Sequence, residues 1–254
     1  MLTLLFAAGA ALLAGLLSGI FGVGGGVVLV PLFGLLLGLD QHHAQGVTLA
    51  ILLFPIGAAA VREYHRAGAV RWRLVLPLIA GFLAGVGAGS LGANVLPERA
   101  LRLVFIAFLV VVASRNLRGR KGEATAAPPP ARSRWHAVWI GAAGGVAGGL
   151  LGIGGAVVMI PFLVSILGLK QHEAQGTTLA VMLPPVGLPG VLVYAQAQGG
   201  LPWTLMAWAA GGFVVGGAVG AKLAIRTRGP WLVRGFALFQ ITVALLLLWR
   251  VLRA

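Results

Sequence analysis

The chain contains a short set of polar residues twice, and their chemistry suits the binding of an anion. The first copy has Gln45 and Thr48, and the second has Gln175, Thr177 and Thr178. Amide and hydroxyl groups donate hydrogen bonds without carrying a charge, and polar residues inside membrane segments tend to face a cavity or another helix. A threonine can instead bond a carbonyl of its own helix, but the duplication of the whole set favours a binding site.

A glycine-rich interruption precedes each polar set and breaks a long apolar run. The interruptions are residues 22–26 and 152–156, and a proline follows each at the same distance, Pro31 and Pro161. Glycine is a poor helix former, so helical continuity should fail there. The next segment should then begin with unpaired N–H groups, which attract anions. The predicted backbone part of the site is Gly24, Gly25, Gly26, Gly154, Gly155 and Ala156.

The composition is that of a membrane protein. Of the 254 residues, 59% are hydrophobic and only 9% are charged, whereas a soluble domain carries about 25% charged residues. Apolar stretches of about 20 residues, the length of a membrane-crossing helix, recur from end to end. The net charge of +14 would suggest nucleic acid in a soluble protein. Here the basic residues lie between apolar spans, as in cytoplasmic loops, so no nucleic acid partner is expected.

The two halves of the chain repeat, as is common in transporters. Residues 15–57 align with residues 145–187, and the glycine row at 81, 85 and 89 aligns with the row at 212, 216 and 220. Small residues spaced by four favour close helix packing in lipid. We predict a first repeat over residues 1–117, a basic and proline-rich cytoplasmic linker over 118–134, and a second repeat over 135–254.

Basic charge differs between equivalent loops, which fits halves inserted in opposite senses. The connection 62–73 carries four arginines, and its counterpart 195–202 carries none. We therefore predict an inverted repeat of about five segments per half, with the arginine-rich loop in the cytoplasm. The C-terminal Arg250 and Arg253 fit this orientation poorly. The predicted spans are 4–20, 27–39, 44–61, 74–92 and 101–113, then 135–151, 157–169, 174–194, 203–223 and 232–248.

Two matched histidines offer a second kind of chemistry. His42 and His172 could titrate near neutral pH and couple transport to protons, or they could simply cap a helix or lie at the membrane interface. Acidic ligands are scarce, so no metal is expected, and the lack of cysteine excludes thiol catalysis and disulfides. No serine–histidine–acid or paired-carboxylate arrangement stands out, so neither an enzyme nor a cofactor is expected.

These motifs resemble those of the TauE/SafE family, also called the sulfite exporter or TSUP family. The resemblance rests on the glycine break through Pro31, followed by residues 45–50, and on their copies at 149–161 and 175–180. It implies a multi-pass inner-membrane permease for a small sulfur-containing anion such as sulfite or a sulfonate. The copies differ, because Val47 stands opposite Thr177, and Ala156 replaces a third glycine.

Together these features predict an α-helical secondary transporter that works by alternating access. The anion would bind between the halves against helix N-termini, whose dipoles offset its charge without a buried arginine. A gradient of protons, or alternatively of sodium ions, would drive it. An anion channel remains an alternative, as does a membrane scaffold that hands a sulfur compound to a partner enzyme. Apart from the lipid bilayer, the sequence indicates no other partner and leaves the oligomeric state open.

Overall fold

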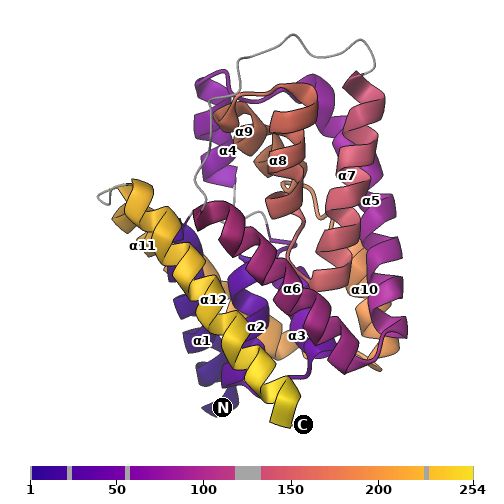
Figure 1. Cartoon of the computed structure of the whole chain (residues 1–254), viewed down its shortest axis with the longest axis vertical. Coiled ribbons are helices and arrows are strands. Elements are labelled where there is room, and N and C mark those ends of the chain that lie inside the picture. The colour runs from indigo at the N-terminus through magenta and orange to yellow at the C-terminus, as the bar shows by residue number, and fades with distance from the viewer. Residues whose placement is uncertain (1, 22–24, 55–57, 118–132, 226–228, 254) are drawn as a thin grey trace.

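The computed structural model describes residues 2–21, 25–54, 58–117, 133–225 and 229–253, and these residues form helices and no strand. This confirms the predicted all-α fold. Gly24, which was predicted as part of the site, lies outside the described residues. The helices (Figure 1) are α1 (Leu2–Phe21), α2 (Gly26–Leu36), α3 (Gln41–Ile51), α4 (Ala58–Arg66), α5 (Trp72–Val95), α6 (Glu98–Leu117), α7 (Ser133–Leu151), α8 (Ala156–Leu167), α9 (Gln171–Val181), α10 (Leu188–Ala197), α11 (Trp203–Ile225) and α12 (Gly229–Arg253).

Both glycine-rich interruptions separate two helices, as predicted. The first lies between α1 and α2, and the second lies between α7 and α8. Gly155, immediately before α8, has φ +72°, a left-handed conformation that glycine takes at no steric cost. Gly25, immediately before α2, has φ −53°. The residue immediately before the helix therefore differs in backbone conformation between the two copies.

The predicted spans 44–61 and 174–194 are wrong as continuous helices. The first is divided into α3 and α4, and the second into α9 and α10. Pro184 and Pro185 fall between α9 and α10. A proline has no N–H to donate and disfavours the helical conformation of the residue before it, so consecutive prolines interrupt the span that was predicted to be continuous. The described residues of each half therefore form six helices, and α7 begins at Ser133, inside the segment predicted as linker.

Rows of glycine join helices from opposite halves. A Cβ atom added to three glycines of α5 would overlap carbonyl oxygens of α7: Gly81 meets Val138, Gly85 meets Ala142 and Gly89 meets Val146. The equivalent glycines of α11 meet carbonyl oxygens of α1 in the same way: Gly212 meets Ala8, Gly216 meets Leu12 and Gly220 meets Leu16. The backbones of each pair are thus in direct contact, as small residues allow.

The register of these contacts gives the directions of the helices. Residue numbers rise together along α5 and α7, and also along α1 and α11, so both pairs are parallel. In Figure 1, α1 begins at the lower end, beside the N-terminus, whereas α7 begins at the upper end. Opposite starting ends are what inverted halves require.

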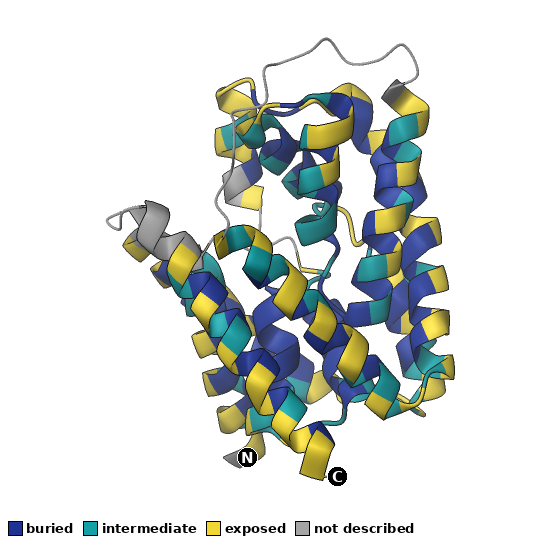
Figure 2. Ribbon diagram, in the orientation of Figure 1, coloured by how far each residue is buried: buried dark blue, intermediate teal, exposed yellow. Residues whose placement is uncertain are grey.

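The outer surface is apolar, as expected of a protein in lipid. Five of the described helices are long and apolar enough to cross a membrane: α1, α5, α6, α11 and α12. The exposed faces of α6 and α12, yellow in Figure 2, carry large apolar side chains such as Val111 and Leu245. Such faces would be unfavourable in water. The chain is a multi-pass membrane protein.

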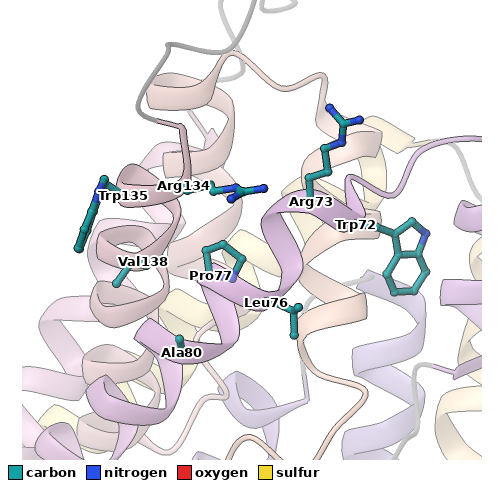
Figure 3. A pocket seen from close by; sticks show the side chains of 8 residues that line it. All are labelled: Trp72, Arg73, Leu76, Pro77, Ala80, Arg134, Trp135 and Val138. Atoms are coloured by element: carbon teal, nitrogen blue, oxygen red, sulfur yellow. The ribbon is translucent and has the colours of Figure 1, made fainter.

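One end of the α5–α7 pair carries the features of a membrane interface. An open groove of about 590 Å³ lies where the two helices begin (Figure 3), and it is lined by Trp72, Arg73, Leu76, Pro77, Ala80, Arg134, Trp135 and Val138. Tryptophan is enriched at the membrane–water interface, and arginine is enriched on the cytoplasmic side. The positive-inside prediction therefore places this end, shared with α4, in the cytoplasm.

The C-terminal arginines, which fitted the predicted orientation poorly, have structural roles. Arg250 donates to the carbonyl oxygens of Gly34 (2.9 Å) and Leu35 (3.2 Å), near the C-terminal end of α2. Arg253 lies over the ring of Trp249, at 3.9 Å from its centroid. A cation at a helix C-terminus is favourable because it meets the negative end of the dipole. These contacts account for Arg250 and Arg253 without invoking the orientation of the protein in the membrane.

The glycine contacts predict a matched pair of substitutions in α11. Gly216→Ala places a methyl group against the carbonyl oxygen of Leu12, whereas a Cβ atom at Gly211 would meet nothing within 4 Å. We expect Gly216→Ala to destabilise the protein by about 1–3 kcal/mol, the usual cost of overpacking, and Gly211→Ala to leave its stability unchanged or raise it by up to about 1 kcal/mol, because alanine is the better helix former. Thermal unfolding of the purified protein in detergent measures both. Equal melting temperatures would contradict the close contact of α1 and α11.

Candidate anion site

The second break touches the beginning of α2 inside the molecule. A Cβ atom added to Gly26, the first residue of α2, would overlap the backbone of Ile153 and lie 2.6 Å from the carbonyl oxygen of Gly152. All three residues are buried. The start of one short helix and the break before the other therefore meet, although they belong to different halves of the chain.

Gln45 of α3 lies against the same break. A Cβ atom at Gly152 would be 2.8 Å from the Cα atom of Gln45. Gln45 and Thr48, three residues further along α3, are fully buried, and Gln45 Nε2 and Thr48 Oγ1 have no hydrogen-bond partner among the described residues. Buried polar groups in folded proteins are nearly always paired. These two groups are therefore available to a bound ligand.

The second polar set separates into residues with different roles. Thr177 Oγ1 accepts a hydrogen bond of 3.0 Å from the N–H of Arg71, and Gln175 Oε1 accepts one of 3.2 Å from the hydroxyl of Tyr64. The adjacent Thr178 is 1% exposed, and its Oγ1 has no partner within the described part of the chain. Thr178 is thus the counterpart of Thr48, whereas Thr177 holds the segment that leads into α5.

Two of the predicted backbone positions in the described residues, Gly25 and Gly155, are tightly packed. A Cβ atom at Gly25 would overlap the ring of Phe213, and one at Gly155 would overlap the carbonyl oxygen of Gly144. The N–H of Ala156 donates to the carbonyl oxygen of Gly154 at 3.0 Å, so this predicted donor is already used within the break. The side-chain donors of α3 and α9 are therefore better placed to receive a ligand than the N–H of Ala156.

The matched histidines lie outside this cluster. His42 Nε2 is 3.1 Å from the carbonyl oxygen of Ala93 at the end of α5. His172 is exposed, and its ring centroid lies 6.5 Å from that of Tyr64. Both residues belong to the first turn of their helices, α3 and α9. Their part in proton coupling stays a prediction.

Three residues of the region are not among those predicted from the sequence: Tyr64, Tyr194 and Ser90. Tyr194 is fully buried, and its hydroxyl lies 2.7 Å from Gln45 Oε1. Ser90 Oγ is buried without a partner in the described residues, near Gly149 of α7. The two tyrosines are the only ones in the chain, and they are separated by the same number of residues as Gln45 and Gln175. This equal spacing could have identified them from the sequence. Ser90 has no polar counterpart in the second half and so gave no signal.

In the part of the chain that the structure describes, the interior offers hydrogen-bond donors but no charged group. The buried polar side chains in the described residues are uncharged: Gln41, Gln45, Thr48, Ser90, Thr177, Thr178 and Gln240. The N-terminal end of α2, which lies against the second break, adds positive potential, because a helix macrodipole is equivalent to about half an elementary charge. A small anion held weakly fits this chemistry better than a cation does.

Known proteins that resemble this chain show its class and its family. The relatives are named as membrane transporters, in agreement with the broken helices and the apolar exterior, and the chain is a membrane transporter. Residues 7–247 match the model of the family "Sulfite exporter TauE/SafE". The chain belongs to the TauE/SafE family, as its motifs predicted.

Relatives in several bacteria match over nearly their whole length. A "Probable membrane transporter protein" of Haemophilus influenzae is 28% identical over 92% of this chain and 93% of its own length. One of Xylella fastidiosa is 29% identical over 94% of this chain and 92% of its own. The protein YdhB of Bacillus subtilis, named in the same way, is 28% identical over 83% and 86%. An inner-membrane location agrees with these bacterial relatives. No solved structure matches the chain significantly.

Two adjacent threonines of α9 should respond differently to the loss of their hydroxyl groups. Thr177→Val leaves the N–H of Arg71 without its partner, which should cost about 1–3 kcal/mol of stability. Thr178→Val removes a buried hydroxyl that has no partner among the described residues and should leave the melting temperature unchanged or raise it. Thermal unfolding of both variants without ligand checks the difference. If Thr178→Val lost stability and Thr177→Val did not, Thr178 would be the structural residue and Thr177 would not.

Proposed function

We propose that this protein is a secondary transporter for a small sulfur-containing oxyanion, sulfite or an organosulfonate, and that it works by alternating access. The family to which the chain belongs suggests the substrate class. The site is the junction of the second break, the start of α2 and the polar side chains of α3. By the symmetry of the repeat, Thr178 and its neighbours in α9 belong to the same pathway.

The observation that carries this proposal is a set of buried donors without partners. Gln45 Nε2, Thr48 Oγ1 and Thr178 Oγ1 are at most 1% exposed as residues and lack hydrogen-bond partners in the described part of the chain. Each such group costs about 1–3 kcal/mol, and an oxyanion would recover that energy because its oxygens accept several hydrogen bonds at once. Uncharged donors would also release the anion readily, as a transporter needs.

The arrangement of the halves supports alternating access. Each half contributes helices to a pair with the other half, and α1 and α7 begin at opposite ends of the molecule in Figure 1. We propose that the halves are inverted, which would give the protein two related conformations open to opposite sides. Rocking of one half against the other would then expose the junction to each side in turn.

Transport by the purified protein in liposomes tests the proposal. We expect saturable uptake of radiolabelled sulfite or of an organosulfonate, and counterflow when the liposomes are preloaded with the unlabelled anion. A carrier shows both, because it must reorient for each ion moved. Uptake that rises linearly with concentration and shows no counterflow would identify a channel instead. Absence of any anion flux would end the proposal.

The unpaired hydroxyl groups give the matching variants. Thr48→Val and Thr178→Val keep the shape of the side chain and remove one donor each. We expect each to raise the KM for the anion about 10- to 100-fold, the equivalent of one hydrogen bond to a charged group. Thr204→Val is the control, since Thr204 is exposed on α11 and should transport normally. Unchanged KM values in both buried variants would remove these hydroxyl groups from the site.

A further inference from the structure

The only two tyrosines of the chain form a crossed pair of bonds between the halves. Tyr194 of α10, in the second half, donates to Gln45 Oε1 of the first half at 2.7 Å. Tyr64 of α4, in the first half, donates to Gln175 Oε1 of the second half at 3.2 Å. We call these two hydrogen bonds the crossed bonds. The two tyrosines occupy equivalent positions in the repeat, and so do the two glutamines. The same contact therefore occurs twice, once from the second half to the first and once from the first half to the second.

A glycine follows each glutamine and makes room for the tyrosine of the other half. A Cβ atom at Gly46 would lie 3.0 Å from the Cβ atom of Tyr194, and one at Gly176 would lie 2.9 Å from that of Tyr64. Both distances are shorter than ordinary contacts between such atoms. In each half, the glutamine therefore bonds the tyrosine of the other half, and the following glycine packs against it.

The two crossed bonds are unequal in this structure. Tyr194 is fully buried, and its hydroxyl also lies 2.9 Å from the carbonyl oxygen of Gly149, close to the second break. Tyr64 is only half-buried, its bond is longer, and its ring neighbours the exposed His172. In Figure 1, α4 lies at the upper end, with the starts of α5 and α7, whereas α10 lies in the lower half. The tight bond and the loose bond thus face opposite ends of the molecule.

Each tyrosine also determines how its glutamine can act. A glutamine amide has one accepting oxygen and one donating nitrogen. When Oε1 accepts from the tyrosine hydroxyl, Nε2 is left to donate elsewhere, and Gln45 Nε2 is buried without a partner among the described residues. Gly152 of the second break lies against the Cα atom of the same residue. The hydrogen bond to Tyr194 therefore leaves the donating side of the Gln45 amide without a partner in the described residues, in a side chain that lies beside the second break.

We propose that Tyr64 and Tyr194 are positioning residues of the anion site, and that the crossed bonds open in turn during transport. Each crossed bond orients one glutamine and closes one route to the junction. In this structure the Tyr194–Gln45 route is closed, and the Tyr64–Gln175 route, at the arginine-rich end, is the one nearer to opening. This inference rests on the proposed function, because it assumes that the junction is reached from both sides.

The absence of cysteine from the chain allows a direct test with single-cysteine reporters. Thr178→Cys reports on the α9 side and Thr48→Cys on the α3 side; both positions are buried. The rate of alkylation by a water-soluble maleimide is measured without substrate, in each reporter alone and combined with Tyr64→Phe or Tyr194→Phe. Phenylalanine keeps the ring and removes only the hydroxyl group, so the packing against the glycines is retained.

The two substitutions should have opposite effects. Tyr64→Phe should raise the alkylation rate of T178C about fivefold and leave that of T48C unchanged. Tyr194→Phe should raise the alkylation rate of T48C about fivefold and leave that of T178C unchanged. The factor is the one by which the loss of one hydrogen bond shifts an equilibrium. His65→Ala is the control, because it removes an exposed bond between α4 and Trp72 of α5, within one half, and should change neither rate. Equal effects of both tyrosine substitutions on both reporters, or no effect, would overturn the alternating crossed bonds.

Transport kinetics test the positioning role separately. In liposomes, Tyr64→Phe and Tyr194→Phe should each raise the KM for the anion at least fivefold, because the glutamine amide is no longer held. An unchanged KM in both variants would overturn positioning. The alkylation rates need no substrate, so opposite shifts in a protein that moves no anion would refute the proposed function and keep the crossed bonds. Normal uptake of the anion together with identical alkylation rates in all variants would keep the proposed function and refute the alternating crossed bonds.

Discussion

A helix that stops at membrane depth leaves peptide groups that lipid cannot satisfy, and this constraint governs the structure. Such a break is tolerated only where protein surrounds it. Here the surrounding protein comes from the opposite half: Gly26 and Gln45 cover the second break, and Phe213 of α11 covers Gly25. The glycine rows make this possible, because backbones in direct contact bring the two halves close enough to shield the interruptions.

The same closeness explains why the interior can remain uncharged. A buried arginine would bind an anion strongly but would be costly in the membrane, and it would release its ligand slowly. Amides, hydroxyl groups and the positive end of a short helix give a weaker and cheaper attraction.

The sequence was informative wherever a residue acts through its own chemistry. Glycine and apolar runs predicted the helices, the two breaks and the close helix pairs, and Gln45, Thr48 and Thr178 are buried as a site requires. It failed where the outcome depends on neighbours distant in the chain. Nothing local distinguishes Thr177, which binds the N–H of Arg71, from the unpaired Thr178. The division of the spans after Ile51 and Val181 was missed, because the residues that follow are as apolar as the helices they separate.

Exchange of partners between the halves also has a consequence for biosynthesis. α5 can pair with α7 soon after both have left the ribosome, because only α6 lies between them in the described residues. α1 must wait for α11, which is made after all the helices from α2 to α10. The face of α1 that meets the glycine row of α11 therefore lacks this neighbour until α11 has been made.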